Sequence, residues 1–489
     1  FSYLLTFGGF GTISRSKIIQ QSPLLAMVIL LPVGVVLFTF SSALVYIFGI
    51  NYPLIGLTLM VIISLHELYK SKQNNGLTSV NQITLLCSLG LTTALLLLIR
   101  VVVSPVLTFD SYKIIISGKS FGSSIFSFES SELASFPFMV TNFQAATEIF
   151  NFSYTAYLPA VTGFLAMTGA IIIISNLVSP SRKYSFTFGV IVLMTILAFG
   201  SVTYMLRMQL GYLNSHLLMA GYYSLGFATC LLGNNSDKRT PNLYLSALLI
   251  GVVAFIRLEG MLLMTLLIIS FVSINKLSRK DSAKFALFAL VVPGLWYVRL
   301  AIAGASGSTI ISPRNTILML LFATSPLIIN WWRQTLKVVD YLPNLTISGL
   351  GCIFCFLLLT REQTIESSLI FLTNTVGTGY WGAFWWTFGP LAMVLACVGP
   401  KIKREIVWVM TIGGGLLVIL LLGAIRRIPY RIGWGDSGNR MLVHIAPLTV
   451  LYIAMKVYAW FLTGRSSATE GDKGIGTLDI VDLIRNRLL

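Results

Sequence analysis

The chain has few charged side chains and very few acidic ones. Charged residues make up 10% of its 489 residues, only 17 are Asp or Glu, and 56% are hydrophobic. A soluble globular protein carries about 25% charged residues, and a disordered chain has far fewer hydrophobic ones. The composition excludes both classes and predicts a chain embedded in a lipid bilayer.

Cysteine and histidine are also scarce. All five cysteines lie in apolar runs, and the pair Cys352 and Cys355 falls inside a predicted membrane helix with no second pair to complete a metal site. The three histidines are far apart in the sequence. We therefore expect neither a disulfide scaffold nor a histidine-based metal site.

Long apolar runs are abundant. A helix needs about 20 residues to cross the hydrocarbon core, and the sequence predicts fourteen such spans, within a range of 12–14. They lie at 24–48, 52–68, 82–104, 157–179, 185–206, 211–232, 242–257, 260–275, 284–303, 315–331, 344–360, 383–399, 405–424 and 440–462. The runs are continuous, which excludes alternating barrel strands. We predict an all-α polytopic membrane protein in which some of the shorter runs are broken or re-entrant.

The basic residues predict the orientation of the chain. Lys and Arg number 34, which gives a net charge of +17. Cytoplasmic loops of membrane proteins are rich in Lys and Arg, and a cytoplasmic N-terminus places 22 of the 34 cations on that side, together with the C-terminal tail. The charge excess therefore indicates a membrane orientation and not a nucleic-acid partner.

The 12 cations on the outer side include ten arginines. A guanidinium binds phosphate or carboxylate through two parallel hydrogen bonds, whereas lysine acts as a point charge. The bias towards arginine indicates a phosphate-bearing ligand on this side. The alternative interpretation is that arginine side chains at helix ends reach towards the water.

Residues 105–156 form the only long outer loop. Its density of aromatic and serine residues predicts short helices lying on the membrane surface. The first would cover 111–117. Asp110, just before it, is either the cap of this helix or a general base.

Two clusters of charge lie at predicted outer ends of spans. Arg257 and Glu259 lie between two apolar runs, where an ionisable pair is either a local ion pair or part of a functional site. The segment 426–440 holds four arginines and three glycines, which permit close approach of a ligand. Binding of anionic lipid headgroups is the alternative interpretation of this segment.

Four segments, in this order, resemble the GT-C superfamily of membrane glycosyltransferases, which includes mannosyl- and arabinosyltransferases. Thr108–Tyr112 is similar to the family's acidic first outer loop, and Arg257–Gly260 to its Arg-x-Glu-Gly segment. Pro293–Arg299 followed by Gly304 resembles its Pro-x-x-x-Trp segment, and Gly438–Pro447 its closing helix. The chain departs from the family in having a single aspartate at 110 and an additional pair of spans before the loop.

The resemblance implies an enzyme that moves a sugar from a polyprenyl-phosphate donor to a glycan, lipid or protein acceptor, with inversion. Asp110 would be the general base. The residues expected at the donor phosphate are Arg440, Arg257, Arg431 and Arg427. The supporting residues are Glu259, Tyr112, Lys113, Asp436, His444 and Arg299. A divalent metal stays an alternative, although the single aspartate favours a mechanism without one.

The resemblance also implies a domain organisation and a location. Residues 1–81 would be a cytoplasmic segment with an added hairpin of spans, 82–463 the catalytic membrane domain, and 464–489 a cytoplasmic tail. The site would face the outside of a plasma (inner) membrane of the cell envelope, surrounded by membrane lipids. The aromatic cluster Tyr380, Trp381, Trp385 and Trp386 would lie near the membrane interface or near the sugar.

Other functions remain open. A transporter or flippase for lipids or oligosaccharides would also have many spans and intramembrane charges, but no internal repeat is evident in the sequence. A ligase or polymerase of lipid-linked polysaccharides would also be rich in outer arginines. Sugar identity, acceptor class, lipid length and oligomeric state are not predicted.

Overall fold

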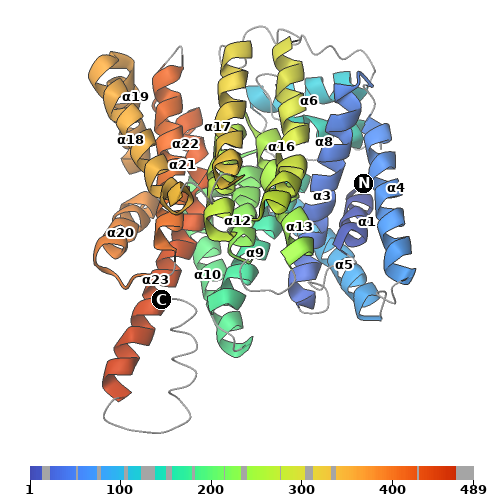
Figure 1. The fold of residues 1–489 in the computed structure, drawn as a ribbon, viewed down its shortest axis with the longest axis horizontal. Helices are drawn as coiled ribbons and strands as arrows, with labels where there is room; N and C mark the ends of the chain where they lie inside the picture. The colour runs from blue at the N-terminus through green and yellow to red at the C-terminus, as the bar shows by residue number, and fades with distance from the viewer. Residues whose placement is uncertain are drawn as a thin grey trace. The chain divides into compact units, whose positions relative to one another are not determined.

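The computed structural model describes residues 1–13, 22–50, 53–73, 79–103, 108–122, 138–149, 157–178, 182–213, 215–232, 239–275, 277–302, 312–331, 337–402, 404–426 and 429–469. Every regular element in these ranges is a helix (Figure 1). This confirms the prediction of an all-α protein. The chain divides into two compact units. Unit 1 comprises residues 1–169 and 208–339, and unit 2 comprises 170–207 and 340–489.

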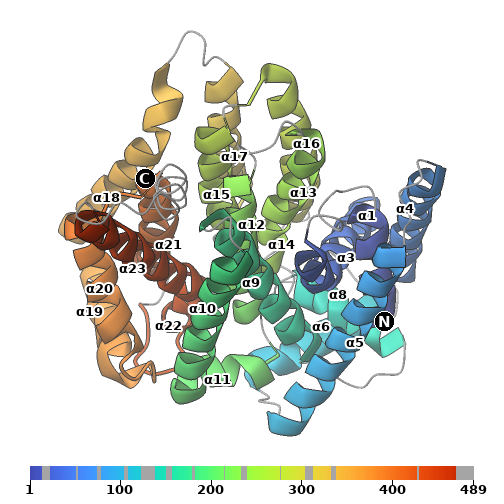
Figure 2. The same ribbon diagram turned by 90° about the horizontal axis from the view of Figure 1, so that it is seen from below.

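Unit 1 begins with helices packed at glycines. They are α1 (Ser2–Ile13), α3 (Pro23–Ile47), α4 (Pro53–Gln73) and α5 (Ser79–Val102). The helix α1 lies against α3 (Figure 2). A Cβ atom at Gly9 would lie 1.8 Å from the carbonyl oxygen of Leu30, so the two backbones are in direct contact. The helix α1 is therefore packed into the helix assembly, with Leu5, Phe10 and Ile13 buried.

The outer loop of the prediction contains two helices, α6 (Phe109–Gly122) and α8 (Phe138–Ile149). The helix α6 begins before Asp110, and the backbone N–H of Ser111 donates to Oγ1 of Thr108 (3.4 Å). Thr108 therefore occupies the capping position, and the prediction that Asp110 caps the helix is wrong. The described side chains of α8, residues 138–147, are all buried within the protein, and its position at the membrane surface stays a prediction.

The rest of unit 1 consists of apolar helices. After α9 (Tyr157–Val178), which continues into unit 2, they are α12 (His216–Leu232), α13 (Arg239–Gly251), α14 (Val253–Ile256), α15 (Gly260–Asn275), α16 (Arg279–Ile302) and α17 (Pro313–Trp331). The helices α13, α16 and α17 lie side by side (Figure 1). Between α14 and α15 the helix is interrupted, and Arg257 has an extended backbone (φ −151°, ψ 164°).

Unit 2 contains the remaining helices. They are α10 (Arg182–Val202), the first turn of α11 (Tyr204–Gly211), the last two residues of η1 (Lys337–Tyr341), α18 (Leu342–Thr360), α19 (Glu362–Thr373), the π-helical turn η2 (Asn374–Thr378), α20 (Phe384–Val398), α21 (Glu405–Ile425), α22 (Ser437–Met441), η3 (Leu442–His444) and α23 (Ala446–Thr469). The helices α18 and α19 both pack against α21.

Helices cover all fourteen apolar runs, but they differ in length. Among the described residues, seven are long and apolar enough to cross a membrane, or eight if the bent pair Ser437–His444 and Ala446–Phe461 is one span. Five shorter apolar helices include Leu243–Ile256 and Gly260–Asn275, which lie at two of the shorter runs of the prediction. The chain is therefore a membrane-embedded helical protein, and the count of fourteen spans stays a prediction.

Candidate functional site

The break between α14 and α15 is built around Gly260. A Cβ atom there would lie 2.1 Å from the carbonyl oxygen of Val253. Only glycine allows this close approach of two backbones without displacing one of them. Because α15 begins at Gly260, the three residues before it form the connection in which Arg257 and Glu259 lie.

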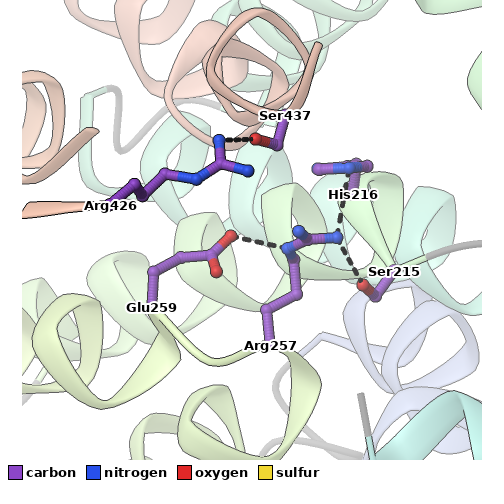
Figure 3. Close-up of polar contacts among 6 residues, drawn as sticks. All are labelled: Ser215, His216, Arg257, Glu259, Arg426 and Ser437. Carbon is purple, nitrogen blue, oxygen red and sulfur yellow. Dashed lines mark hydrogen bonds and ion pairs between the residues drawn. The ribbon is translucent and has the colours of Figure 1, made fainter. Parts of the chain in front are cut away.

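Arg257 lies at the centre of a polar cluster (Figure 3). Its Nε donates to Oε1 of Glu259 at 2.5 Å. Its Nη1 donates to Oγ of Ser215 at 3.2 Å and to Nε2 of His216 at 3.1 Å. The side chain of Arg257 is 19% exposed, and that of Glu259 is 6% exposed. The ion pair predicted as one alternative for this segment is therefore present.

The hydrogen bonds define the state of the cluster. A guanidinium has five N–H donors and no acceptor, so Nε2 of His216 accepts and the ring carries its proton on Nδ1. Three donors of Arg257 are engaged, and the two on Nη2 have no partner among the described residues. The two N–H groups on Nη2 of Arg257 can thus donate hydrogen bonds to another group, such as a ligand.

Two helix N-termini meet this cluster. His216 is the first residue of α12, and Glu259 immediately precedes α15. The positive end of the helix dipole, at the N-terminus, favours anions. At the start of α15 the N–H groups of Gly260, Leu262 and Leu263 already donate to backbone carbonyls, so the unengaged guanidinium donors and the helix dipoles are what suit the cluster to an oxyanion.

Aromatic packing holds α14 in place. The ring of Phe255 lies 5.7 Å from that of Phe138 on α8 and 6.2 Å from that of Trp296 on α16. The hydroxyl of Tyr297 donates to the carbonyl of Ala254 at 3.0 Å. The predicted segments 257–260 and 293–299 are therefore brought together by direct packing.

The start of α6 is tied to the chain just before α12. Oγ1 of Thr108 donates to the hydroxyl of Tyr212 at 2.8 Å, three residues before Ser215. Asp110 is the second residue of α6, and its side chain lies outside the described part of the structure. The helix that carries Asp110 is thus joined to the segment that contacts Arg257.

In unit 2, hydrogen bonds from polar side chains hold the predicted loop from 426 to 440 in place. The carboxylate of Asp436 caps α22 through the N–H of Asn439 (3.1 Å) and accepts the N–H of Arg431 (3.0 Å). The amide of Asn374 bonds the carbonyl of Arg431 (2.8 Å) and the N–H of Gly433 (2.7 Å). Asp436 therefore shapes the loop.

A second contact in this loop involves Arg426, whose Nη1 donates to Oγ of Ser437 (Figure 3). A Cβ atom at Gly438 would lie 2.6 Å from the ring of Tyr430. This glycine therefore allows packing inside the loop, which is a different role from the close approach of a ligand that the sequence predicted.

The other predicted residues have varied environments. In unit 1, Tyr112 is 55% exposed, and Lys113 and Arg299 are half-buried. In unit 2, Arg431 is exposed, Arg440 is 9% exposed and His444 is fully buried. Arg427 lies outside the described residues. The described residues contain no group of three or more His, Cys, Asp or Glu side chains that could hold a metal ion.

Ser215, His216 and Tyr212 were not predicted as site residues. The sequence signal was slight: a Ser-His pair directly before an apolar run, with one of only three histidines in the chain. Ser215 and His216 contact Arg257, which is more than 40 residues away, and Tyr212 contacts Thr108, which is 104 residues away. A single sequence does not show these contacts.

No protein-family model, curated protein or solved structure matches this chain.

Proposed function

We propose that the protein is an integral-membrane glycosyltransferase that moves a sugar from a polyprenyl-phosphate donor to an acceptor on the extracytoplasmic face. The observation that carries this proposal is the unengaged Nη2 edge of Arg257 at the junction of two helix N-termini. Such a site binds the phosphate of a lipid-linked donor, and it stabilises the negative charge that grows on the phosphate as it leaves.

In the proposed reaction, an acceptor hydroxyl attacks the anomeric carbon of the donor. The bond between this carbon and the phosphate oxygen breaks, and a glycosidic bond forms with inversion. Asp110 takes the proton of the hydroxyl, a step that contributes about 10²–10⁴-fold to the rate. Arg257 stays fixed by Glu259, Ser215 and His216, so its remaining donors need no reorganisation during the reaction.

The polar contacts of unit 1 agree with the predicted topology. On the predicted outer side, Tyr157 donates to the carbonyl of Val103 (3.2 Å). On the predicted inner side, Asn275 donates to the carbonyl of Cys230, and Asn330 donates to that of Leu277, both at 3.0 Å. Each contact joins two helix ends that the prediction assigns to the same side of the membrane.

A transporter of lipids or oligosaccharides is the second candidate. The two short apolar helices Leu243–Ile256 and Gly260–Asn275 favour it, because transporters bind substrates at the ends of such half-length helices. Transport would need Arg257 to bind the phosphate, but it would need no proton acceptor at Asp110.

The test is sugar transfer or donor hydrolysis with a panel of polyprenyl-phosphate sugars, using protein in lipid nanodiscs. The native protein should release polyprenyl phosphate, Asp110→Asn should lower the rate by about 10²-fold or more, and Arg440→Ala should also lower it. A native rate in Asp110→Asn would refute the assigned base. Donor binding without any cleavage, accompanied by movement of donor across vesicles, would support the transporter.

A further inference from the structure

Unit 2 presents one tyrosine in a strained backbone conformation. Tyr380 has φ +61°, and it follows the π-helical turn η2. A non-glycine residue in the left-handed region is sterically unfavourable, and such strain persists only where the surroundings hold it. Single π-helical turns often occur at functional sites.

The residues on both sides of Tyr380 are held by one amide. Oδ1 of Asn439 accepts from Nε1 of Trp381 at 2.7 Å, and Nδ2 of Asn439 donates to the carbonyl of Gly379 at 3.0 Å. The carbonyl of Tyr380 itself accepts from the N–H of Met205 at 3.2 Å. Because three points fix this short segment, the ring of Tyr380 is held in a defined place.

That ring is exposed and has an aromatic neighbour. Tyr380 is 52% exposed, and its ring centroid lies 5.3 Å from that of Tyr204, which is 37% exposed. The guanidinium of Arg207 lies over the ring of Tyr204, 5.5 Å from its centroid. The ring of Tyr380 in the strained segment and the ring of Tyr204 therefore form an exposed aromatic pair, with the cation Arg207 beside it. We call Tyr204 and Tyr380 the tyrosine pair.

The polar groups of the tyrosine pair are available for a ligand. Among the described residues, neither hydroxyl makes a hydrogen bond, and the guanidinium of Arg207 makes none either. The nearby indole of Trp386 differs, since its Nε1 donates to the carbonyl of Val376 at 2.9 Å. The pair thus offers two aromatic faces together with unused hydroxyl and guanidinium groups.

We infer that the tyrosine pair binds a sugar ring of the donor or of the acceptor, an assignment that rests on the proposed function. One face of a pyranose carries C–H groups with partial positive charge, which match the negative face of an aromatic ring. Its hydroxyl groups accept hydrogen bonds from Arg207 and exchange them with the tyrosine hydroxyls. An acyl chain would use none of these polar groups, so a sugar fits better than a lipid tail.

The predicted topology agrees with this assignment. Tyr204 and Arg207 lie at the outer end of the predicted span 185–206, and Tyr380 precedes the outer end of the span 383–399. The pair is therefore expected on the side where lipid-linked sugars are used.

The experiment measures glycan binding to the full chain in nanodiscs of neutral phosphatidylcholine. The probes are an array of neutral oligosaccharides and, separately, hexose 1-phosphates. The variants are Tyr380→Gly, which keeps the left-handed backbone, Tyr204→Leu and Arg207→Gln. The control is Tyr341→Ala, which removes another exposed tyrosine of unit 2 (62% exposed).

We expect the native protein and Tyr341→Ala to bind at least one probe equally, and each of the three variants to bind it about tenfold more weakly. Binding of the neutral glycans assigns the pair to the acceptor, and binding of the hexose phosphates alone assigns it to the donor. The inference is overturned if the native protein binds no probe, or if Tyr380→Gly binds like the control. Reduced incorporation of Tyr380→Gly into nanodiscs, with unchanged glycan binding, would place the pair at the membrane interface instead.

Failure of this inference differs from failure of the proposed function. If sugar transfer is observed while the three variants bind glycans as the native protein does, the glycosyltransferase function is supported and the sugar-binding role of the tyrosine pair is refuted. If the variants lose glycan binding while no donor is ever cleaved, the sugar-binding role of the tyrosine pair is supported and the enzymatic function is refuted.

Discussion

Two ion pairs of the described residues differ in what surrounds them. Arg257–Glu259 in unit 1 and Lys456–Glu405 in unit 2 both have an N–O distance of 2.5 Å. Nζ of Lys456 also donates to the carbonyl of Pro400 (2.8 Å), and it faces the ring of Tyr452 at 5.8 Å. The lysine side chain is 0% exposed, so its donor capacity is used inside the protein.

Arg257 is different because two of its five donors stay unengaged among the described residues and its side chain is partly exposed. The comparison shows that a buried charge is not by itself a sign of a ligand site. An ion pair whose cation is fully buried joins helices, whereas one with unengaged donors beside helix N-termini can bind an anion. Four sets of substitutions test the two units.

The largest effect on stability is expected for Lys456→Met. It leaves Glu405 without its cation, and breaking a buried pair from one side costs about 3–5 kcal/mol. The free energy of unfolding in detergent should fall by this amount. The double variant Lys456→Met with Glu405→Leu should recover most of it, because no lone charge remains. A loss below about 1 kcal/mol in the single variant would show that the pair does not join the helices.

Arg257→Lys should affect activity more than stability. The positive charge stays beside Glu259, but the planar edge is lost, so donor cleavage should fall by about 10²-fold. The melting temperature should change little. Arg279→Lys, at an exposed arginine that bonds the carbonyl of Trp331, serves as the control and should leave cleavage unchanged. Equal rates for both variants would refute the phosphate site.

Gly260→Ala tests the helix break that positions Arg257. The added Cβ atom would meet the carbonyl oxygen of Val253 at 2.1 Å, so the backbone must shift, with an expected cost of about 1–3 kcal/mol. Cleavage by the folded fraction should fall as well. Gly349→Ala is the matched control, since a Cβ atom at Gly349 meets nothing within 4 Å. Unchanged unfolding and cleavage in Gly260→Ala would contradict the role of the close approach.

The smallest effects are expected at the two non-glycine residues with positive φ, Tyr380 and Arg404, both at +61°. Replacing either by glycine relieves strain and should raise the free energy of unfolding by about 1 kcal/mol or less. Arg404 precedes Glu405, which forms the ion pair with the buried Lys456. Arg404→Gly should therefore change only stability. Tyr380→Gly should in addition weaken glycan binding. If both variants differ from the native protein only in stability, Tyr380 has no binding role.

The sequence predicted the helical class and the location of the apolar helices well. Continuous apolar runs favour helices in a bilayer, because a helix satisfies its own backbone hydrogen bonds. The predicted interruption near 257–260 is present, since Arg and Glu followed by Gly cannot continue an apolar helix without cost. The burial of α8 was not predicted, because its composition gives no sign that helices from both sides cover it.

The candidate site was predicted only in part. Arg257 and Glu259 were identified because charge is rare in this chain, and rarity makes each charge conspicuous. Ser215, His216 and Tyr212 were missed, since serine, histidine and tyrosine at a helix start have many ordinary roles. For Asp436, capping and ligand binding look the same in a sequence, and only the positions of the Arg431 and Asn439 N–H groups show that it shapes the loop.

The sequence alone determined that this chain is a helical membrane protein, because hydrophobicity is a property of each run and needs no partner. It also determined which few charges required an explanation. Only the tertiary structure decided which of those charged side chains are enclosed by partners in the protein and which keep unengaged hydrogen-bond donors. The reason is that the hydrogen-bond partners come from helices far apart in the chain. The same holds for Tyr380, whose strained backbone depends on Asn439, a residue 59 positions away that no local pattern connects to it.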